Sequence, residues 1–265
     1  MIFIQKIINV VNQFIYNNHI NWIKTLYINI WSLPLRDAVK IPIYVYGKTD
    51  LVSLNGTIQI SGTIKRGMIK IGKKWDRSEG RTKIKNNGTI TFGNNDLLCQ
   101  GSKIIVNQGA QLILENNVNI RENVNIVVWL KIRIGKNTGI ANHSQLMDTD
   151  FHFMINTLDR SIQKNISEIN IGANNWIGSY TTIKKGTKTP NNTTVSSSYA
   201  VLCKDYTKII PENSIIGGIP AKLIATNYRR VFNTENQSML YTYFEGNTNL
   251  YILSQVQDLD KFCEY

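Results

Sequence analysis

The sequence has few of the residues that build metal sites and disulfide frameworks. Its 265 residues include three histidines and three cysteines. The cysteines, Cys99, Cys203 and Cys263, lie far apart and form no Cys-X-X-Cys pair. An odd number of widely spaced cysteines predicts reduced thiols in a cytoplasmic protein.

Long apolar segments are also missing. No run approaches the ~18 residues that a membrane-spanning helix needs. The N-terminus has neither a basic first region nor a small-residue cleavage site, so we expect no secretory signal. These absences predict a cytoplasmic location and leave contact with the inner face of the membrane open.

Acidic residues are fewer than basic ones. The chain has 30 Lys and Arg residues against 18 Asp and Glu residues, which gives a net charge of +12. This balance favours anionic partners: a phosphorylated cofactor, a sugar nucleotide or lipid pyrophosphate, an anionic membrane or a nucleic acid. No nucleic-acid recognition motif is visible, and Asn, Ile and Gly dominate in place of interleaved Arg and aromatic residues. We therefore expect no nucleic-acid partner.

What the sequence does contain is a sixfold repeat. Neither a helix nor a simple strand sustains a step of six residues, whereas a parallel β-helix does. Three hexads make one triangular coil, and stacked coils align the branched residues into an apolar column. Looser runs of the same spacing extend from Ile84 to Leu146, and the Asn and Gly residues between the apolar positions suit corners that need a left-handed backbone. The clearest run consists of Ile171, Ile177, Ile183, Thr189, Val195 and Val201.

Two stretches of this region resemble a known family. IGANNWIGSYTTIKKGT is similar to the coil motif of the hexapeptide-repeat acyltransferases, and SIIGGIPAKLI is similar to their closing motif. The match covers roughly residues 134–226 and is most like the bacterial sugar O-acetyltransferases of surface-polysaccharide synthesis. The resemblance implies an all-β fold, a left-handed parallel β-helix. It also implies a homotrimer whose active sites lie at the seams between chains.

We expect three regions along the chain. Residues 1–36 form an N-terminal helical segment, residues 37–226 form the β-helix, and residues 227–265, with YRRVF and LYILSQVQDL, form a C-terminal helical cap. Residues 1–33 have two open interpretations: peripheral contact with a membrane, or a cover over the open end of the β-helix. The segment 64–85 holds nine Lys or Arg residues against two acidic ones, and it is interpreted either as an anion-facing surface or as a solvated loop.

The repeat breaks after Leu146, and we expect residues 147–168 to form an extruded loop. This loop contains His152 in the sequence D-T-D-F-H. Acyl transfer to a hydroxyl needs a base, and histidine suits that role near neutral pH. The resemblance also implies a catalytic histidine here, although Phe153 replaces the usual proline. Asp148 and Asp150 either orient His152 and bind sugar hydroxyls or cap the turn that starts the loop.

The resemblance further implies where a cofactor and an acceptor bind. Asn142 and His143, one coil earlier, are candidates for holding the acceptor sugar, with a simple corner role as the alternative for Asn142. Small residues allow a pantetheine arm to approach the backbone, and a lysine follows near the phosphates. The candidate cofactor-binding residues are Trp176, Gly178, Ser196, Ser197, Gly217 and Lys222.

Together these features predict an acetyl-CoA-dependent O-acetyltransferase that acts on a sugar of a surface polysaccharide or its precursor. The alternatives are an N-acetyltransferase of an amino sugar and a catalytically inactive β-helix scaffold. A metal-dependent β-helix hydratase needs three histidine ligands, and His19 lies in the N-terminal segment, far in sequence from His143 and His152. We therefore expect no metal.

Overall fold

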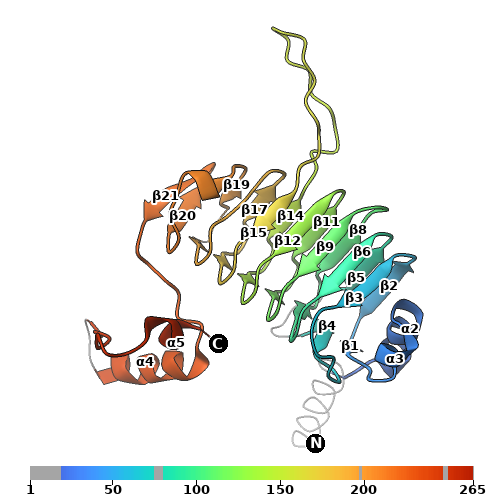
Figure 1. Cartoon of the computed structure of the whole chain (residues 1–265), viewed down its shortest axis with the longest axis horizontal. Coiled ribbons are helices and arrows are strands. Elements are labelled where there is room, and N and C mark those ends of the chain that lie inside the picture. Colours follow the sequence, from blue (N-terminus) through green and yellow to red (C-terminus); the bar gives the residue numbers. More distant parts are fainter. Residues whose placement is uncertain (1–18, 75–79, 197–198, 247–249, 265) are drawn as a thin grey trace, which may run out of the picture.

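The computed structural model describes residues 19–74, 80–196, 199–246 and 250–264. Within these residues, the chain winds into three parallel sheets in register, the arrangement typical of a left-handed β-helix (Figure 1). The predicted fold class is thereby confirmed. The nine-stranded sheet contains β1 (Ile43–Val45), β4 (Ile69–Lys73), β7 (Leu97–Cys99), β10 (Asn119–Ile120), β13 (Gly139–Ile140), β16 (Trp176–Ile177), β18 (Thr194–Val195), β20 (Ile215–Gly218) and β21 (Ala221–Ala225).

The other two sheets complete each coil. The seven-stranded sheet contains β2 (Thr49–Leu54), β5 (Thr82–Asn86), β8 (Lys103–Val106), β11 (Asn125–Val128), β14 (Gln145–Met147), β17 (Thr182–Lys184) and β19 (Val201–Leu202). The five-stranded sheet contains β3 (Thr57–Ile60), β6 (Thr89–Phe92), β9 (Gln111–Leu114), β12 (Lys131–Ile134) and β15 (Ile169–Ile171).

Register between coils places like residues on top of one another. Ile177 lies between Ile140 and Val195 in the nine-stranded sheet, and all three side chains are completely buried. A β-branched side chain suits this pleated, fully buried position, so the sixfold spacing follows from the geometry of the coil. The hydrophobic core is therefore one continuous column along the coil.

One member of the predicted column is wrong. Leu202, and not Val201, pairs with Ile183 and is fully buried, whereas Val201 is only partly buried. The distance from Val195 to the next inward residue is therefore seven positions. Side chains in a strand alternate between its two faces. One extra residue at the corner therefore turns Leu202 towards the core and Val201 away from it.

The corners between the five- and nine-stranded sheets use left-handed backbone. Asn95, Asn117, Asn137 and Asn174 all have φ between 55° and 61°, which asparagine tolerates better than most residues. Their amides also bond along the coil axis: Asn117 donates to Asn137 at 2.9 Å and Asn137 donates to Asn174 at 3.0 Å. The asparagines expected at corners thus form a continuous row.

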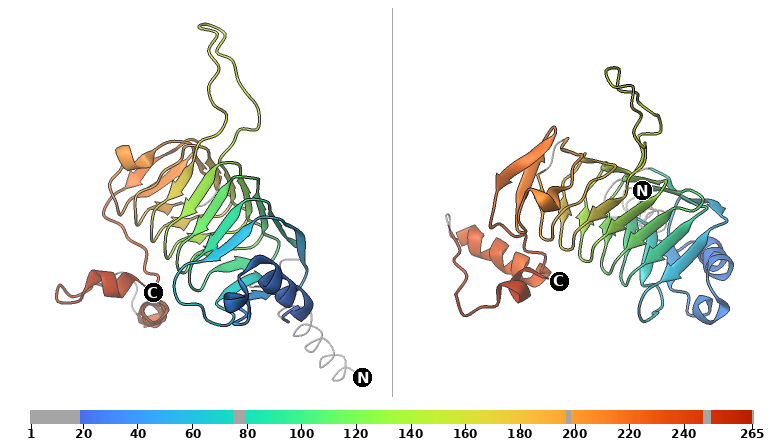
Figure 2. Two further views of the ribbon diagram at one scale, coloured as in Figure 1. Left: turned by 45° about the vertical axis from the view of Figure 1, so that its right-hand side comes forward. Right: turned by 45° about the horizontal axis from the view of Figure 1, so that its top comes forward.

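At the N-terminal end, helix α2 (Trp22–Ser32) and the short helix α3 (Leu35–Ala38) lie beside the first coil (Figures 1 and 2). The Asn29 side chain bonds both the N–H and the C=O of Ile43, so α2 satisfies the open edge of β1. Residues 1–18, on which part of the membrane prediction falls, lie outside the described residues.

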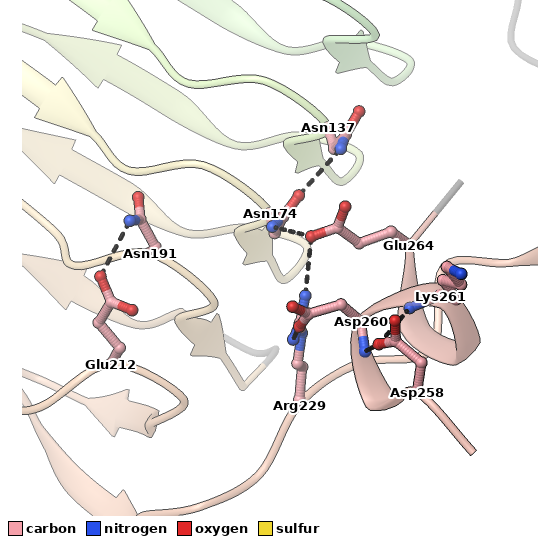
Figure 3. A network of polar contacts seen from close by, with 9 residues as sticks. All are labelled: Asn137, Asn174, Asn191, Glu212, Arg229, Asp258, Asp260, Lys261 and Glu264. Atoms are coloured by element: carbon pink, nitrogen blue, oxygen red, sulfur yellow. Dashed lines mark hydrogen bonds and ion pairs between the residues drawn. The ribbon is translucent and has the colours of Figure 1, made fainter. Parts of the chain in front are cut away.

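At the other end, β21 pairs antiparallel with β20, after a 3-10 turn at Tyr206–Lys208. Helices α4 (Thr234–Gly246) and α5 (Leu259–Cys263) then lie beside the coil (Figure 1). YRRVF and nearly all of LYILSQVQDL are non-helical, so the two C-terminal helices form elsewhere in the segment than at these stretches. Glu264, which follows α5, accepts from the last amide of the asparagine row at 3.3 Å and from Arg229 at 2.9 Å (Figure 3).

Candidate active site

The extruded loop is an antiparallel hairpin, which we call the arm (residues 149–166). Bridges join Thr149 to Ile166 and Ile155 to Ile162. The arm occupies the corner between β14 and β15 and stands away from the coil in all three views (Figures 1 and 2). One coil earlier, this corner is only two residues long, between β11 and β12. The arm is therefore an insertion on a regular scaffold, where functional residues are expected.

Asp148 lies at the base of the arm and is completely buried. Its carboxylate accepts hydrogen bonds from the backbone N–H groups of Trp129 (2.7 Å), Leu130 (2.8 Å) and Lys131 (2.8 Å). Burial raises the pKa of this carboxyl group, while the three N–H donors favour its ionised form. Both oxygens are engaged at the preceding corner, so Asp148 caps that turn and joins the arm to the coil.

Asp150 is held from the next coil. Its carboxylate lies 2.9 Å from the Lys185 ammonium and 3.7 Å from that of Lys184. Lys185 also donates to the C=O of Lys164 on the returning strand of the arm, at 2.8 Å. These contacts tie both strands of the arm to the end of β17. Because the groups are partly exposed, solvent weakens the ion pairs.

His152 is exposed on the arm, just beyond this root. Phe151 precedes it in a left-handed conformation (φ 62°), and the Phe151 ring packs edge-on against Trp129 with centroids 6.3 Å apart. His152, Asp150 and Lys185 contribute to the lining of a cavity of about 460 Å³ between the strands of the arm. Among the described residues, no hydrogen bond joins His152 to either aspartate.

The predicted cofactor-binding residues gather on the nine-stranded sheet. Gly178, Ser196 and Gly217 each follow an inward residue, and backbone hydrogen bonds link successive coils at these positions. A Cβ on Gly217 would lie 2.2 Å from the Ser196 hydroxyl oxygen, so a larger residue here would require the Ser196 side chain to move. Lys222 pairs with Gly217 across β20 and β21 and is exposed. Ser197 lies outside the described residues.

Trp176 lies on the outer surface of the same sheet, as its position before Ile177 predicts. Its ring covers Gly139, where an added Cβ would come within 2.8 Å of the indole. The guanidinium of Arg230, from the C-terminal segment, lies 3.6 Å from the centroid of the Trp176 ring. This cation–π contact links the C-terminal segment to the candidate cofactor surface.

His143 belongs to an exposed row of aromatic rings at the corner between the nine- and seven-stranded sheets. Its ring stacks on Tyr180 with centroids 4.8 Å apart, and Tyr180 lies 5.2 Å from Tyr199. Asn142 adjoins this row, and its C=O accepts from the N–H of Tyr180 at 3.0 Å. We did not predict Tyr180 and Tyr199. Their sequence positions could have indicated them. Tyr180 and Tyr199 follow the inward residues Ile177 and Val195 at the same corner where His143 follows Ile140.

The candidate residues thus form two groups at different corners of the coil. The arm, with His152, leaves the corner between the seven- and five-stranded sheets. The small residues and the aromatic row lie at the corner between the nine- and seven-stranded sheets. His152 and the candidate cofactor-binding residues are therefore separated by the width of one sheet within a single chain.

The described residues contain no cluster of three or more His, Cys, Asp or Glu side chains that could hold a metal ion. In the same part of the chain, no helix has the length and apolar character required to span a bilayer.

Comparison with known proteins finds one curated relative. No family model matches the chain. The putative lipopolysaccharide biosynthesis O-acetyl transferase WbbJ of Escherichia coli (strain K12) is 29% identical over 150 residues, which are 53% of this chain and 74% of that protein. The sixfold repeat and the three parallel sheets are typical of a left-handed β-helix, and the sequence is similar to this O-acetyl transferase over about half of the chain.

Solved structures with similar coils include two acetyltransferases. The polySia specific acetyltransferase NeuO has a TM-score of 0.48 and 15% identity, covering 77% of this chain and 98% of its own. The polysialic acid O-acetyltransferase OatWY has a TM-score of 0.47 and 22% identity, covering 81% and 98%. The N-acyltransferase AntD from Bacillus cereus, solved with coenzyme A, has a TM-score of 0.36 and 11% identity, covering 77% of this chain and 88% of its own.

Proposed function

We propose that this protein transfers an acetyl group from acetyl-CoA to a hydroxyl of a surface polysaccharide or its precursor, with His152 as the general base. The observation that carries the proposal is an exposed histidine on an arm that interrupts a regular coil, in a chain related to a lipopolysaccharide O-acetyl transferase. The arm has no structural task in the coil, since the same corner closes with two residues one coil earlier.

The reaction needs few groups from the protein. The His152 imidazole takes the proton from the acceptor hydroxyl as the hydroxyl oxygen attacks the thioester carbonyl carbon. The C–S bond then breaks, and the leaving CoA thiolate takes up the proton from the imidazolium. A backbone N–H stabilises the oxyanion between the two steps. Holding both reactants in one groove supplies much of the remaining rate.

The pantetheine chain of CoA would follow the small residues Gly178, Ser196 and Gly217, which we call the donor row. Small side chains leave the backbone N–H and C=O groups of the donor row accessible to an extended ligand. Trp176 flanks the donor row, and Lys222 supplies positive charge for the phosphates. Asn142 and His143, with the aromatic row, offer stacking and hydrogen-bonding surface to a sugar ring.

We also propose a homotrimer that completes the site. The arm exposes Phe153 (66%), Met154 (77%) and Leu158 (93%) and has no core of its own. Apolar side chains on a projecting hairpin are stabilised when a neighbouring surface covers them. A second copy would cover these side chains. It would also bring its own donor row close to His152, whereas within one chain the donor row and His152 are separated by the width of a sheet.

The test measures free thiol released from acetyl-CoA with a panel of neutral, acidic and amino sugars. The native chain is compared with His152→Ala and with His19→Ala as the matched histidine control. We expect sugar-dependent turnover that falls ~10²-fold in His152→Ala and stays unchanged in His19→Ala. CoA binding, measured by calorimetry, should persist in both variants.

Each other result points elsewhere. Equal turnover in the native chain and His152→Ala would remove His152 from the mechanism. Turnover only with amino sugars would make the protein an N-acetyltransferase. A chain that binds no CoA would leave the scaffold interpretation, and a monomer by light scattering would contradict the shared site.

A further inference from the structure

Helix α2 is oriented opposite to an ordinary surface helix. Its completely or almost completely buried side chains are Thr25, Ile28 and Asn29, two of which are polar. The Thr25 hydroxyl accepts from the N–H of Val45, and the Asn29 side chain bonds both backbone groups of Ile43. These bonds replace the strand that β1 lacks, so the polar residues must face the coil.

The opposite face of α2 is apolar and faces outward. Residues at positions i, i+1, i+4, i+5, i+8 and i+9 lie on one side of a helix. Six side chains at these positions are exposed by 44–84%, and three of them are aromatic. They are Trp22, Ile23, Leu26, Tyr27, Ile30 and Trp31. We call this surface the α2 outer face.

Positive charge lies beside the Trp22 end of the α2 outer face. The Arg66 guanidinium lies 6.0 Å from the centroid of the Trp22 ring, and Lys65 beside it is exposed. Arg66 comes from the basic segment 64–85, which supplies β4 and β5 of the coils that α2 adjoins. Lys40, two residues after α3, is also exposed, whereas the exposed Arg36 on α3 pairs with Asp37 at 3.2 Å.

We propose that the α2 outer face binds the surface of an anionic lipid bilayer, with α2 lying in the plane of the headgroups. Trp and Tyr are the side chains that favour this interfacial zone, and isoleucines supply apolar surface that enters the acyl boundary. Nearby Lys and Arg residues add attraction to anionic headgroups.

Charge argues for a bilayer over the other occupants. A second copy docked through the same face would bring one basic surface against another, which electrostatic repulsion disfavours. A nucleic acid would match the charge but would leave the exposed isoleucines in water. A bilayer satisfies both the apolar side chains and the cations around them.

The test is cosedimentation of the full chain with vesicles. One set contains phosphatidylglycerol and phosphatidylcholine, and the other contains phosphatidylcholine alone. We expect binding to the first set, weaker binding to the second, and loss of the difference as salt rises. Ile23→Gln with Ile30→Gln should lower the partition coefficient at least about tenfold, because both side chains lose apolar transfer energy.

Matched controls separate this face from the rest of the surface. Ile209→Gln with Ile252→Gln alters two similarly exposed isoleucines, one between β19 and β20 and one in the C-terminal segment, and should leave binding unchanged. Lys65→Gln with Arg66→Gln should weaken binding at low salt more than Lys103→Gln with Lys136→Gln does. Thermal unfolding of each variant checks that the fold persists.

Three results would overturn the proposal. These are equal binding by the α2 variant and its isoleucine control, no difference between the two vesicle sets at low salt, and no binding by the native chain. If the native chain also forms assemblies that Ile23→Gln with Ile30→Gln dissolves, a second copy is the occupant. The test reads binding alone, so its failure would leave the proposed acetyl transfer standing.

Discussion

The coil and the arm are stabilised in different ways. In the coil, each inward side chain contacts its counterparts above and below, and Ile140, Ile177 and Val195 are wholly buried. In the arm, Leu158 is 93% exposed and backbone bridges join the two strands without a core between them. The coil is therefore stable through its own contacts, whereas the arm depends on its root and on whatever covers it.

Because of this difference, the coil should determine the stability of the chain, and the arm should affect its activity. A continuous apolar column makes the coil rigid, and rigid elements position reacting groups well. The arm carries His152 but contributes little to the core, so changes there should affect activity without unfolding the chain. The following predictions test this division, beginning with the largest effect.

Shortening a side chain in the column should be costly. Ile177→Ala leaves a cavity between two coils, and we expect the free energy of unfolding to fall by about 2–5 kcal/mol. Leu158→Ala in the arm is the matched aliphatic control and should change it by less than about 0.5 kcal/mol. Chemical denaturation measures both values. Similar losses would mean that the arm is part of the cooperative core.

Asp148 joins the coil to the arm. Its removal should therefore lower the free energy of unfolding nearly as much as Ile177→Ala does. Asp148→Ala leaves the N–H groups of Trp129, Leu130 and Lys131 without their acceptor. We expect a loss of about 2–3 kcal/mol in the free energy of unfolding, since three backbone donors at a partly buried site lose a charged acceptor. Asp150→Ala is the control and should cost less than about 1 kcal/mol. A loss as small in Asp148→Ala would show that solvent replaces the carboxylate.

The coil should also respond to pH. Asp96 is completely buried, and burial raises the pKa of its carboxyl group from 3.8 to about 7. The folded chain then keeps a proton that the unfolded chain releases. Stability from this group is complete below about pH 4 and falls as pH rises towards about 7, by up to ~1.4 kcal/mol per pH unit.

Two substitutions check the source of that slope. Asp96→Asn should flatten the dependence of the melting temperature on pH across this window. Asp159→Asn, on the arm, should leave it unchanged, because hydrogen bonds to Ser161 lower the pKa of that exposed carboxyl group. A slope that survives in Asp96→Asn would assign it to another buried acid, such as Asp148.

The smallest effect concerns the root of the arm. Lys185→Gln removes the ion pair with Asp150, and we expect stability to change by less than about 0.5 kcal/mol because the groups are partly exposed. The backbone N–H of Asp150, which bonds to Asn165, should exchange with solvent faster. Lys136→Gln is the control. Unchanged exchange would mean that the strand bridges alone hold the arm.

Much of the fold was accessible from the sequence because its determinants are local and periodic. The sixfold spacing of branched residues predicted the column, and the asparagines predicted left-handed corners. The break after Leu146 located the arm. The spacing failed at Val201, where an extra residue lies in a corner, because corner length does not appear in the apolar pattern.

The candidate site was predictable only as a set of residues. Gly178, Ser196 and Gly217 each follow an inward residue, so the repeat itself indicated that they are aligned. The partners of the aspartates carried no such signal: Asp148 bonds to amides about 18 positions away, and Asp150 pairs with a lysine on the next coil. The Arg230–Trp176 contact likewise depends on where the C-terminal segment folds back.

By itself, the sequence determined the coil, its corners, the position of the arm and the histidine on it, because a repeated local pattern specifies each of these. Tertiary structure alone decided that Asp148 anchors a turn and that α2 turns its polar side inward. Both depend on backbone groups left open by distant strands, and the cost of leaving such groups unpaired outweighs the local preference of a side chain.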